Sequence, residues 1–345
     1  MKSIVTKHGI LLRKTKNSFE NEGVFNPAVI QEGPVVHMFY RAVREGNFST
    51  LGYCKLDGPL TVTERSEIPV FSPQESYEFK GTEDPRIVKI SDTYYLTYSA
   101  FDGINVFGAY ATSKNLKQFK RQGIITPKFT FEEYSELIKH NFEKISNKHL
   151  LFYDLFVRYR LAEMMKGKIY VWDKNLMFFP RKINGKFAVL HRLFPSIQLV
   201  TFNDSKELTP EFWKEYITNL RQHIVLLPRY HYECSHIGGG CPPIETDSGW
   251  LLIYHAAEMT PTGLIYQASA ALLDKNDPTK LLARLKEPLF SPTEPWEKKG
   301  VVDNVVFPTG TALFDDDLYI YYGAADQYVA VASVSLQKLL EQLSY

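Results

Sequence analysis

Acidic, basic and amide side chains stand beside short apolar segments throughout this sequence. The segment 81–86 (Gly-Thr-Glu-Asp-Pro-Arg) places two carboxylates next to an arginine, and Asp84 directly precedes a proline. Cleavage of a glycosidic bond needs a carboxyl group that protonates the leaving oxygen. The pattern therefore favours a sugar-cleaving enzyme with Asp84 as the proton donor, although an aspartate before proline also commonly caps a turn.

Further polar residues begin or end comparable segments and could converge with Asp84. They are Asn26, Arg41, Glu83, Arg86, Asn175, His191, Arg192, His255, Asp303, Asn304 and Asp326. Taken singly, Arg86 could equally be a salt-bridge partner and His255 a structural histidine, and the glycines 238–240 are expected to form a turn. The set lacks the three-histidine spacing of a zinc site, a glycine-rich phosphate loop and a nucleophile elbow. We therefore expect no metal and no organic cofactor.

The composition narrows the classes of partner. Of the 345 residues, 40 are Lys or Arg and 39 are Asp or Glu, so no basic excess supports nucleic-acid binding. Aromatic residues make up 14%, which suits both β-strands and the apolar faces of sugars. No apolar stretch is long enough to span a bilayer. The N-terminal residues lack the apolar run of a signal peptide, so we expect a cytoplasmic protein, or a periplasmic one if a signal peptide was removed.

One pattern repeats five times along the chain and predicts the elements that position these residues. Each repeat has a proline, an apolar strand, a turn, a Tyr-rich strand and a further short strand, and the prolines are Pro27, Pro85, Pro180, Pro242 and Pro308. Short antiparallel strands in five similar units indicate an all-β fold, a five-bladed β-propeller formed by a single domain over residues 1–345. Alternating strands could also form a β-sandwich, but that fold gives no reason for a proline-marked strand pair to recur five times. Asp84 then begins an inner strand that faces the central channel.

Three segments carry apolar residues at helical spacing. The segment of about 131–166 is expected to be a helical insertion between blades two and three, as a lid, an oligomer contact or an outer support. A second helix is expected over Pro210–Leu220 and a short C-terminal helix over about 336–343. Assembly into a homo-oligomer is left open.

Six motifs, in order along nearly the whole chain, carry a resemblance to a known family. They are 39–42 (Phe-Tyr-Arg-Ala), 83–86 (Glu-Asp-Pro-Arg), 179–192, 237–244, 249–255 and 321–326 (Tyr-Tyr-Gly-Ala-Ala-Asp). The chain resembles glycoside hydrolase family 130, which comprises β-mannoside phosphorylases and related inverting β-mannosidases. The resemblance also implies a five-bladed propeller.

The resemblance assigns roles to individual residues. Asp84 is implied to be the general acid of an inverting reaction that passes its proton through a sugar hydroxyl. We expect burial or nearby negative charge to raise its pKa. Sugar binding is implied for Asn26, Arg41, Asn175 and Asp326, and we include Arg86, Asp303 and Asn304 among the substrate-binding candidates.

The nucleophile is left open between phosphate and water. Lys174, Arg192, His236 and His255 match the family's phosphate-binding positions, but His236 stands where phosphorylases usually carry lysine. A neutral histidine weakens a phosphate site, so the first hypothesis is an inverting β-mannosidase acting on short manno-oligosaccharides. Glu233 is the candidate base, with Glu245 in reserve. The alternative is a β-mannoside phosphorylase that uses inorganic phosphate and releases mannose 1-phosphate. A third, weaker alternative is a non-catalytic carbohydrate-binding propeller.

Overall fold

The computed structural model describes residues 4–139 and 168–344, which are mostly β-structure. The first sheet has eight strands, in the order β2-β3-β4-β6-β7-β8-β9, with β5 paired to β4. Its strands are β2 (Gly23–Glu32), β3 (Val35–Arg44), β4 (Phe48–Asp57), β5 (Thr61–Arg65), β6 (Gly81–Ile90), β7 (Thr93–Phe101), β8 (Val106–Ser113) and β9 (Lys120–Ile124). A single parallel pair, Ser49 with Gly81, joins β4 to β6, so this sheet consists of two antiparallel runs of four strands.

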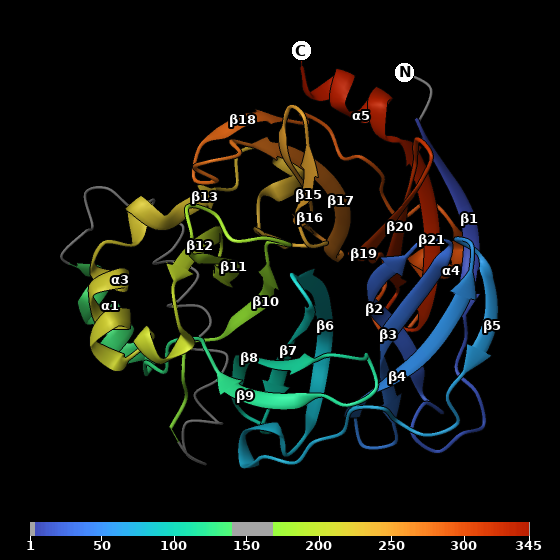
Figure 1. Cartoon of the computed structure of the whole chain (residues 1–345), viewed down its shortest axis with the longest axis horizontal. Helices are drawn as coiled ribbons and strands as arrows, with labels where there is room; N and C mark the ends of the chain where they lie inside the picture. The colour runs from blue at the N-terminus through green and yellow to red at the C-terminus, as the bar shows by residue number, and fades with distance from the viewer. Residues whose placement is uncertain (1–3, 140–167, 345) are drawn as a thin grey trace.

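Three further antiparallel sheets complete the fold. The second contains β10 (Asp173–Phe178), β11 (Phe187–Leu193), β12 (Ile197–Phe202) and β13 (Ile224–Leu226). The third contains β14 (His236–Gly239), β15 (Ile244–Thr246), β16 (Gly249–Thr260), β17 (Gly263–Leu273) and β18 (Leu281–Arg284). The fourth contains β19 (Val306–Phe314), β20 (Asp317–Ala324), β21 (Tyr328–Ser335) and, from the other end of the chain, β1 (Val5–Leu12). Figure 1 shows these sheets arranged around a common centre.

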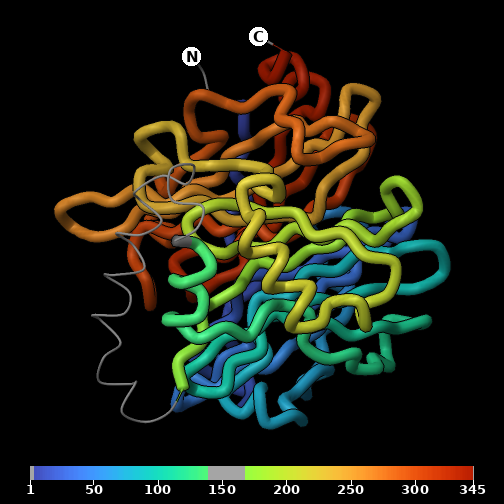
Figure 2. The backbone as a smooth tube through the Cα atoms, turned by 90° about the vertical axis from the view of Figure 1, so that its left-hand side faces the viewer, coloured from blue at the N-terminus to red at the C-terminus, as the bar shows by residue number. Residues whose placement is uncertain are grey.

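The N-terminal strand is paired to the last strand of the chain. β1 runs antiparallel to β21, from the pair Val5 with Val334 to the pair Leu12 with Val329. The two termini consequently lie at the same end of the molecule (Figure 2). This pairing completes a four-stranded sheet from segments that are more than 300 residues apart in sequence.

Apolar side chains fill the space between neighbouring sheets. On β16 and β17, Ile253 and Leu272 pack in one cluster with Ile320 and Ala332 of β20 and β21. The opposite face of β16 contributes Leu252 to another cluster, which includes side chains of β10 and β11. Residues of both faces are buried because each strand alternates its side chains between two packed layers.

Helices lie outside the sheets. They are α1 (Phe131–Lys139), α3 (Pro210–Thr218), α4 (Pro295–Lys298) and α5 (Leu336–Leu343), with the 3-10 turns η1 (Ser76–Glu78), η3 (Ser205–Glu207), η4 (Leu220–His223) and η5 (His231–Glu233). α1 and α3 lie side by side at one edge (Figure 1) and share an apolar cluster. α1 begins the segment expected to be a helical insertion, and the remainder of that segment, 140–166, lies outside the described residues. α5 spans the expected C-terminal helix. No helix in the described ranges has both the length and the apolar character needed to cross a bilayer.

The prolines that mark the sequence repeat do not all hold equivalent places. Pro27, Pro85 and Pro308 lie within β2, β6 and β19, whereas Pro180 follows the end of β10 and Pro242 follows β14. The sequence repeat is therefore out of phase in its third and fourth units, and Pro308 stands one strand position earlier than Pro27 and Pro85. The assignment of residues 1–345 to a single domain stays a prediction.

Candidate active site

Asn26, Asp84 and Asn175 occupy equivalent positions on the first strands of three runs. The strand register shifts at each of them, on β2, β6 and β10. Their φ angles are 50°, 48° and 57°, in the left-handed region. Asn and Asp tolerate this conformation better than other non-glycine residues. A bulge of this kind re-aims one side chain of a strand, and here it turns a polar side chain out of each first strand.

Asp84 lies in a network of buried polar groups. Its Oδ1 accepts a hydrogen bond from Asn26 Nδ2 at 2.7 Å and a longer one from Arg41 Nη1 at 3.4 Å. Arg41 also donates from Nη2 to Glu83 Oε1 at 2.6 Å and from Nε to Ser49 Oγ at 3.0 Å. The structure thus brings Asn26, Arg41 and Asp84 together as the sequence predicted.

The pKa of Asp84 corrects one expectation. Burial raises this pKa, but the Arg41 charge, the Asn26 hydrogen bond and the charges of Lys174 and Arg86 together lower it below 3.8. The raised pKa belongs instead to Asp326, where burial is the largest cause and Asp84 and Glu83 add to it against the charge of Arg41. The pKa of Asp326 is about 6. Of these two carboxyl groups, Asp326 therefore keeps its proton up to a pH of about 6, whereas Asp84 loses its proton at lower pH.

Arg86 fixes the backbone on which Asp84 stands. It is fully buried, and its Nη1 donates to the carbonyl oxygens of Asp84 at 3.0 Å and Pro85 at 2.9 Å. Its Nε donates to the carbonyl oxygen of Gly240, beyond the end of β14. Burial lowers the pKa of Arg86 to about 10. These contacts make Arg86 a positioning residue for Asp84, and a direct contact between Arg86 and substrate stays a prediction.

A second group of side chains combines two cations with two histidines. Lys174 interacts electrostatically with Glu83 and Asp84 on one side and with Arg192 on the other, and burial lowers its pKa. The ring centroids of His236 and His255 lie 6.2 Å apart. Burial, followed by the Arg192 charge, lowers the pKa of both histidines well below 6.5. Both imidazoles are therefore neutral at pH 7.

His255 is a buried member of this group. It is 0% exposed, and neither ring nitrogen makes a hydrogen bond of normal geometry within the described residues, although the ring interacts with the backbone of Gly239. Its ring is tilted against Phe307 at a centroid distance of 4.3 Å and lies near Tyr266. A buried polar group without a full hydrogen bond costs stability, so the fold keeps His255 at this position despite that cost. Sequence reasoning missed Tyr266 and Phe307, although each directly adjoins a residue of the repeat.

Two glycine motifs are explained by close approach rather than by turns. Gly238 and Gly239 belong to strand β14 and do not have a positive φ, so the expected turn at 238–240 is wrong. A Cβ atom on Gly238 would lie 2.6 Å from His255 Nε2 and 2.8 Å from Asn175 Oδ1. A Cβ atom on Gly323 would lie 1.9 Å from Asn26 Oδ1. Both glycines therefore make room for site residues.

Two candidate residues lie elsewhere. Asp303 is partly exposed and forms an ion pair with Lys299. Glu245 pairs with Arg181 at 2.7 Å on the surface. The sequence does not reveal these placements, because both acidic residues stand next to apolar strand segments. Asn304 accepts a hydrogen bond at its carbonyl oxygen from the Tyr266 amide at 2.9 Å, and its role in substrate binding stays a prediction.

Glu233 is fully engaged by structural partners. Its Oε1 accepts hydrogen bonds from Tyr254 Oη at 2.7 Å and from Arg284 Nη2. Its Oε2 accepts from the backbone amides of Arg229 at 2.7 Å and Tyr230 at 2.9 Å. The side chain is 0% exposed. These surroundings leave no room for an activated water, so they do not support Glu233 as a catalytic base.

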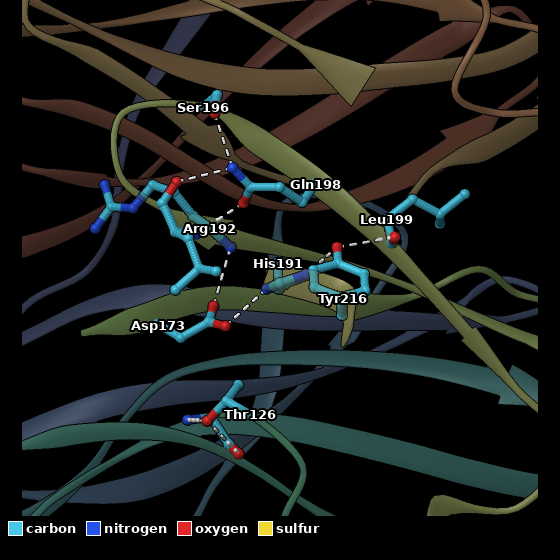
Figure 3. Close-up of polar contacts among 10 residues, drawn as sticks. Thr126, Asp173, His191, Arg192, Ser196, Gln198, Leu199 and Tyr216 are labelled. Atoms are coloured by element: carbon cyan, nitrogen blue, oxygen red, sulfur yellow. Dashed lines mark hydrogen bonds and ion pairs between the residues drawn. The ribbon is translucent and has the colours of Figure 1, made fainter. Parts of the chain in front are cut away.

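His191 also points away from the group around Asp84. Figure 3 shows its ring between Asp173 and Tyr216, with the Arg192 guanidinium extending away from this network. The Nδ1 atom lies 2.7 Å from Asp173 Oδ2, and Nε2 lies 2.8 Å from Tyr216 Oη. Adjacent residues of a strand face opposite ways, so Arg192 faces the site and His191 does not. The prediction that both converge on the channel is wrong for His191.

No group of three or more His, Cys, Asp or Glu side chains is placed to hold a metal ion within 4–139 and 168–344. The described residues bring together two carboxyl groups that interact electrostatically, Asp84 and Asp326, and a second group formed by Lys174, Arg192 and two neutral imidazoles.

Comparison with known proteins assigns the family. The model of glycoside hydrolase family 130, described as β-1,4-mannooligosaccharide phosphorylase, matches residues 4–344. The chain belongs to this family. It is 33% identical over 342 residues to a 1,2-β-oligomannan phosphorylase of Thermoanaerobacter, covering 96% of each chain. It is 31% identical over 341 residues to a β-1,2-mannobiose phosphorylase of the same strain, covering 94% of each.

A solved structure has the same fold. The β-1,2-mannobiose phosphorylase of Listeria innocua, in complex with β-1,2-mannobiose, superposes with a TM-score of 0.73 at 24% identity, covering 100% of this chain and 99% of that one. The relatives are phosphorylases, so the comparisons favour the phosphorylase alternative over the hydrolase that His236 had suggested.

Proposed function

We propose that this chain is an inverting phosphorylase of β-mannosides, with β-1,2-linked oligomannosides as substrates and inorganic phosphate as nucleophile. The observation that carries the proposal is the group of Lys174, Arg192, His236 and His255 beside Asp84, in which neither ring nitrogen of His255 makes a hydrogen bond of normal geometry. Cationic and N–H donors of this kind suit a phosphate ion. The two carboxylates considered as bases for water, Glu233 and Glu245, are instead held in ion pairs.

The proposed reaction uses one proton and one displacement. The Asp84 carboxyl gives its proton, through a sugar hydroxyl, to the oxygen of the leaving sugar as the bond from the anomeric carbon to that oxygen breaks. A phosphate oxygen forms the new bond to the anomeric carbon from the opposite face, which inverts its configuration. The products are mannose 1-phosphate and the shortened oligosaccharide. Asn26, Arg41, Asn175 and Asp326 hold the mannosyl group in this scheme.

Protonation of Asp84 is the step that its neighbouring groups oppose. Arg41 and Asn26 favour the carboxylate form of Asp84, while Asp326 holds a proton up to a pH of about 6. Two carboxyl groups that interact electrostatically titrate as a pair. We propose that a sugar hydroxyl, once bound between them, allows the pair's proton to be used at Asp84.

We also propose that the fold is a five-bladed β-propeller. Five antiparallel runs support this: β2–β5, β6–β9, β10–β13, β14–β18, and β19–β21 completed by β1. In that arrangement β2, β6, β10, β14 and β19 are the inner strands, and the bulges at Asn26, Asp84 and Asn175 aim their side chains at one channel mouth.

The experiment is incubation with β-1,2-mannobiose, with and without inorganic phosphate, followed by chromatography of the products. We expect mannose 1-phosphate and mannose only when phosphate is present. Free mannose released at the same rate in both reactions would overturn the proposal in favour of hydrolysis, and binding without turnover would favour a carbohydrate-binding protein. Arg192→Gln should raise the KM for phosphate, whereas Arg181→Gln, which breaks a surface ion pair, should leave it unchanged.

A further inference from the structure

Four buried glutamates make the same set of contacts in different parts of the fold. Each is 0% exposed, accepts a hydrogen bond from a tyrosine hydroxyl and pairs with a basic side chain from an outer strand. We name each set by its tyrosine: the Tyr40 cluster (Glu20, Arg65), the Tyr98 cluster (Glu78, Arg121), the Tyr254 cluster (Glu233, Arg284) and the Tyr322 cluster (Glu297, Lys7).

The hydrogen bonds in these clusters are short and alike. The tyrosine hydroxyl donates to the glutamate at 2.8 Å in the Tyr40 cluster, 2.6 Å in the Tyr98 cluster, and 2.7 Å in the Tyr254 and Tyr322 clusters. In the last three clusters the second carboxylate oxygen also accepts from two backbone amides. Hydrogen bonds to a charged group in a buried setting are stronger than neutral ones, so each cluster holds its tyrosine firmly.

The tyrosines stand at one fixed place relative to the site. Each lies on the second strand of its run, and the next residue is Arg41 after Tyr40, Ser99 after Tyr98, His255 after Tyr254 and Gly323 after Tyr322. In the second sheet His191 takes the same place before Arg192, held by Asp173 and by Tyr216 of α3. This set is the His191 cluster.

Strand geometry links each cluster to the residue that follows. Successive side chains of a strand point to opposite faces, so the ring enters the cluster and the next side chain faces the site. A hydroxyl held by a buried carboxylate fixes the position and rotation of the strand at that residue. The neighbouring Arg41, Arg192 or His255 is then placed by the strand that carries it.

We propose that the clusters are positioning elements, each acting on the site residue that follows its ring. The Tyr40 cluster places Arg41 against Asp84, and the Tyr254 and His191 clusters place His255 and Arg192 for the phosphate ion. The proposal rests on the proposed phosphorylase function. Under this proposal Glu233 acts by holding Tyr254 in place and not as a catalytic base.

The test compares matched variants that each remove one hydroxyl: Tyr40→Phe, Tyr254→Phe, Tyr216→Phe and Tyr322→Phe. Tyr322→Phe is the control for phosphate binding, because Gly323 lies against Asn26 and not beside the histidines. Initial rates give kcat and the KM for phosphate and for β-1,2-mannobiose, and thermal denaturation gives Tm. We expect Tyr254→Phe and Tyr216→Phe to raise the phosphate KM several-fold with the mannobiose KM unchanged. Tyr40→Phe should lower kcat with the phosphate KM unchanged, and Tyr322→Phe should lower Tm with the phosphate KM unchanged.

Equal kinetic profiles in all four variants, or changes in Tm alone, would overturn the positioning role. Tyr216 lies on helix α3 and contacts His191 from there. Tyr216→Phe therefore tests the His191 cluster without changing any residue of the strand that carries Arg192. If the wild-type protein shows no phosphate-dependent turnover, the proposed function fails first. The clusters are then tested by calorimetric titration with inorganic phosphate, where weaker binding by Tyr254→Phe than by Tyr322→Phe is the expected result and equal binding overturns it.

Discussion

Replacing Asp326 by asparagine should stabilise the protein at neutral pH. Asp326 is partly buried and faces Asp84 and Glu83, and its pKa of about 6 lies above the usual 3.8. A carboxyl group whose pKa is higher in the folded than in the unfolded state contributes stability below about pH 4, and that contribution is lost as the pH rises through about 6. Asparagine keeps the size of the side chain and carries no charge, so the variant does not lose this contribution.

The magnitude follows from the two pKa values. The difference between about 6 and 3.8 corresponds to about 3 kcal/mol, and the partial exposure of Asp326 reduces this to about 1–3 kcal/mol. The assay is urea denaturation followed by tryptophan fluorescence, at intervals from pH 4 to pH 8. The free energy of unfolding of Asp326→Asn, minus that of the wild type, should rise between pH 4 and pH 6 and then stay constant.

The control is Asp303→Asn, the same substitution at an exposed site. The hydrogen bond and charge of Lys299 lower the pKa of Asp303, which is the opposite direction to the shift of Asp326. The Asp303→Asn variant should therefore gain no stability at pH 7. A difference between Asp326→Asn and the wild type that is constant from pH 4 to pH 8 would refute the reasoning. It would mean that Arg41 and Lys174 fully compensate the ionised carboxyl group.

Three further predictions concern the site. Asp84→Asn should bind β-1,2-mannobiose in calorimetry but lose turnover by about 100-fold or more, and near-normal turnover would remove Asp84 from the general-acid role. Gly323→Ala should lose about 1–3 kcal/mol of stability together with activity, because its Cβ would lie 1.9 Å from Asn26 Oδ1; an unchanged urea midpoint would contradict this close approach. His236→Lys should lower the KM for phosphate at pH 7 by adding a cation near Arg192, whereas a higher KM would show that the neutral imidazole is the required donor.

The sequence predicted much of this site because the repeat fixes which strand positions are equivalent. Asn26, Asp84 and Asn175 were each expected at the start of a strand, and all three lie at bulges on first strands. Arg41, Arg192 and His255 were likewise expected near the ends of second strands. An approximate alignment of the repeats was enough for these residues, because each strand segment has a conspicuous polar residue among apolar ones, and that residue is the natural candidate for the site.

What failed needed more than an approximate alignment. His191 and Arg192 are adjacent, and only the direction of alternation on β11 decides which one faces the site. Asp303 precedes β19 by three residues and so stays in the loop. The pKa of Asp84 could not be inferred either, because it depends on which of the cations Arg41, Lys174 and Arg86 face the carboxylate across different strands.

Glu233 shows how the sequence repeat can distinguish structural residues from catalytic ones. Glu20, Glu78 and Glu233 each stand six residues before a site-facing position of the first strand, namely Asn26, Asp84 and Gly239. A buried glutamate that recurs with the same tyrosine and basic partners in four runs serves a need that all four runs share. A catalytic acid or base is needed once, at one place. Asp84 meets that criterion, because the equivalent residues on β2 and β10 are asparagines, which cannot donate an acidic proton.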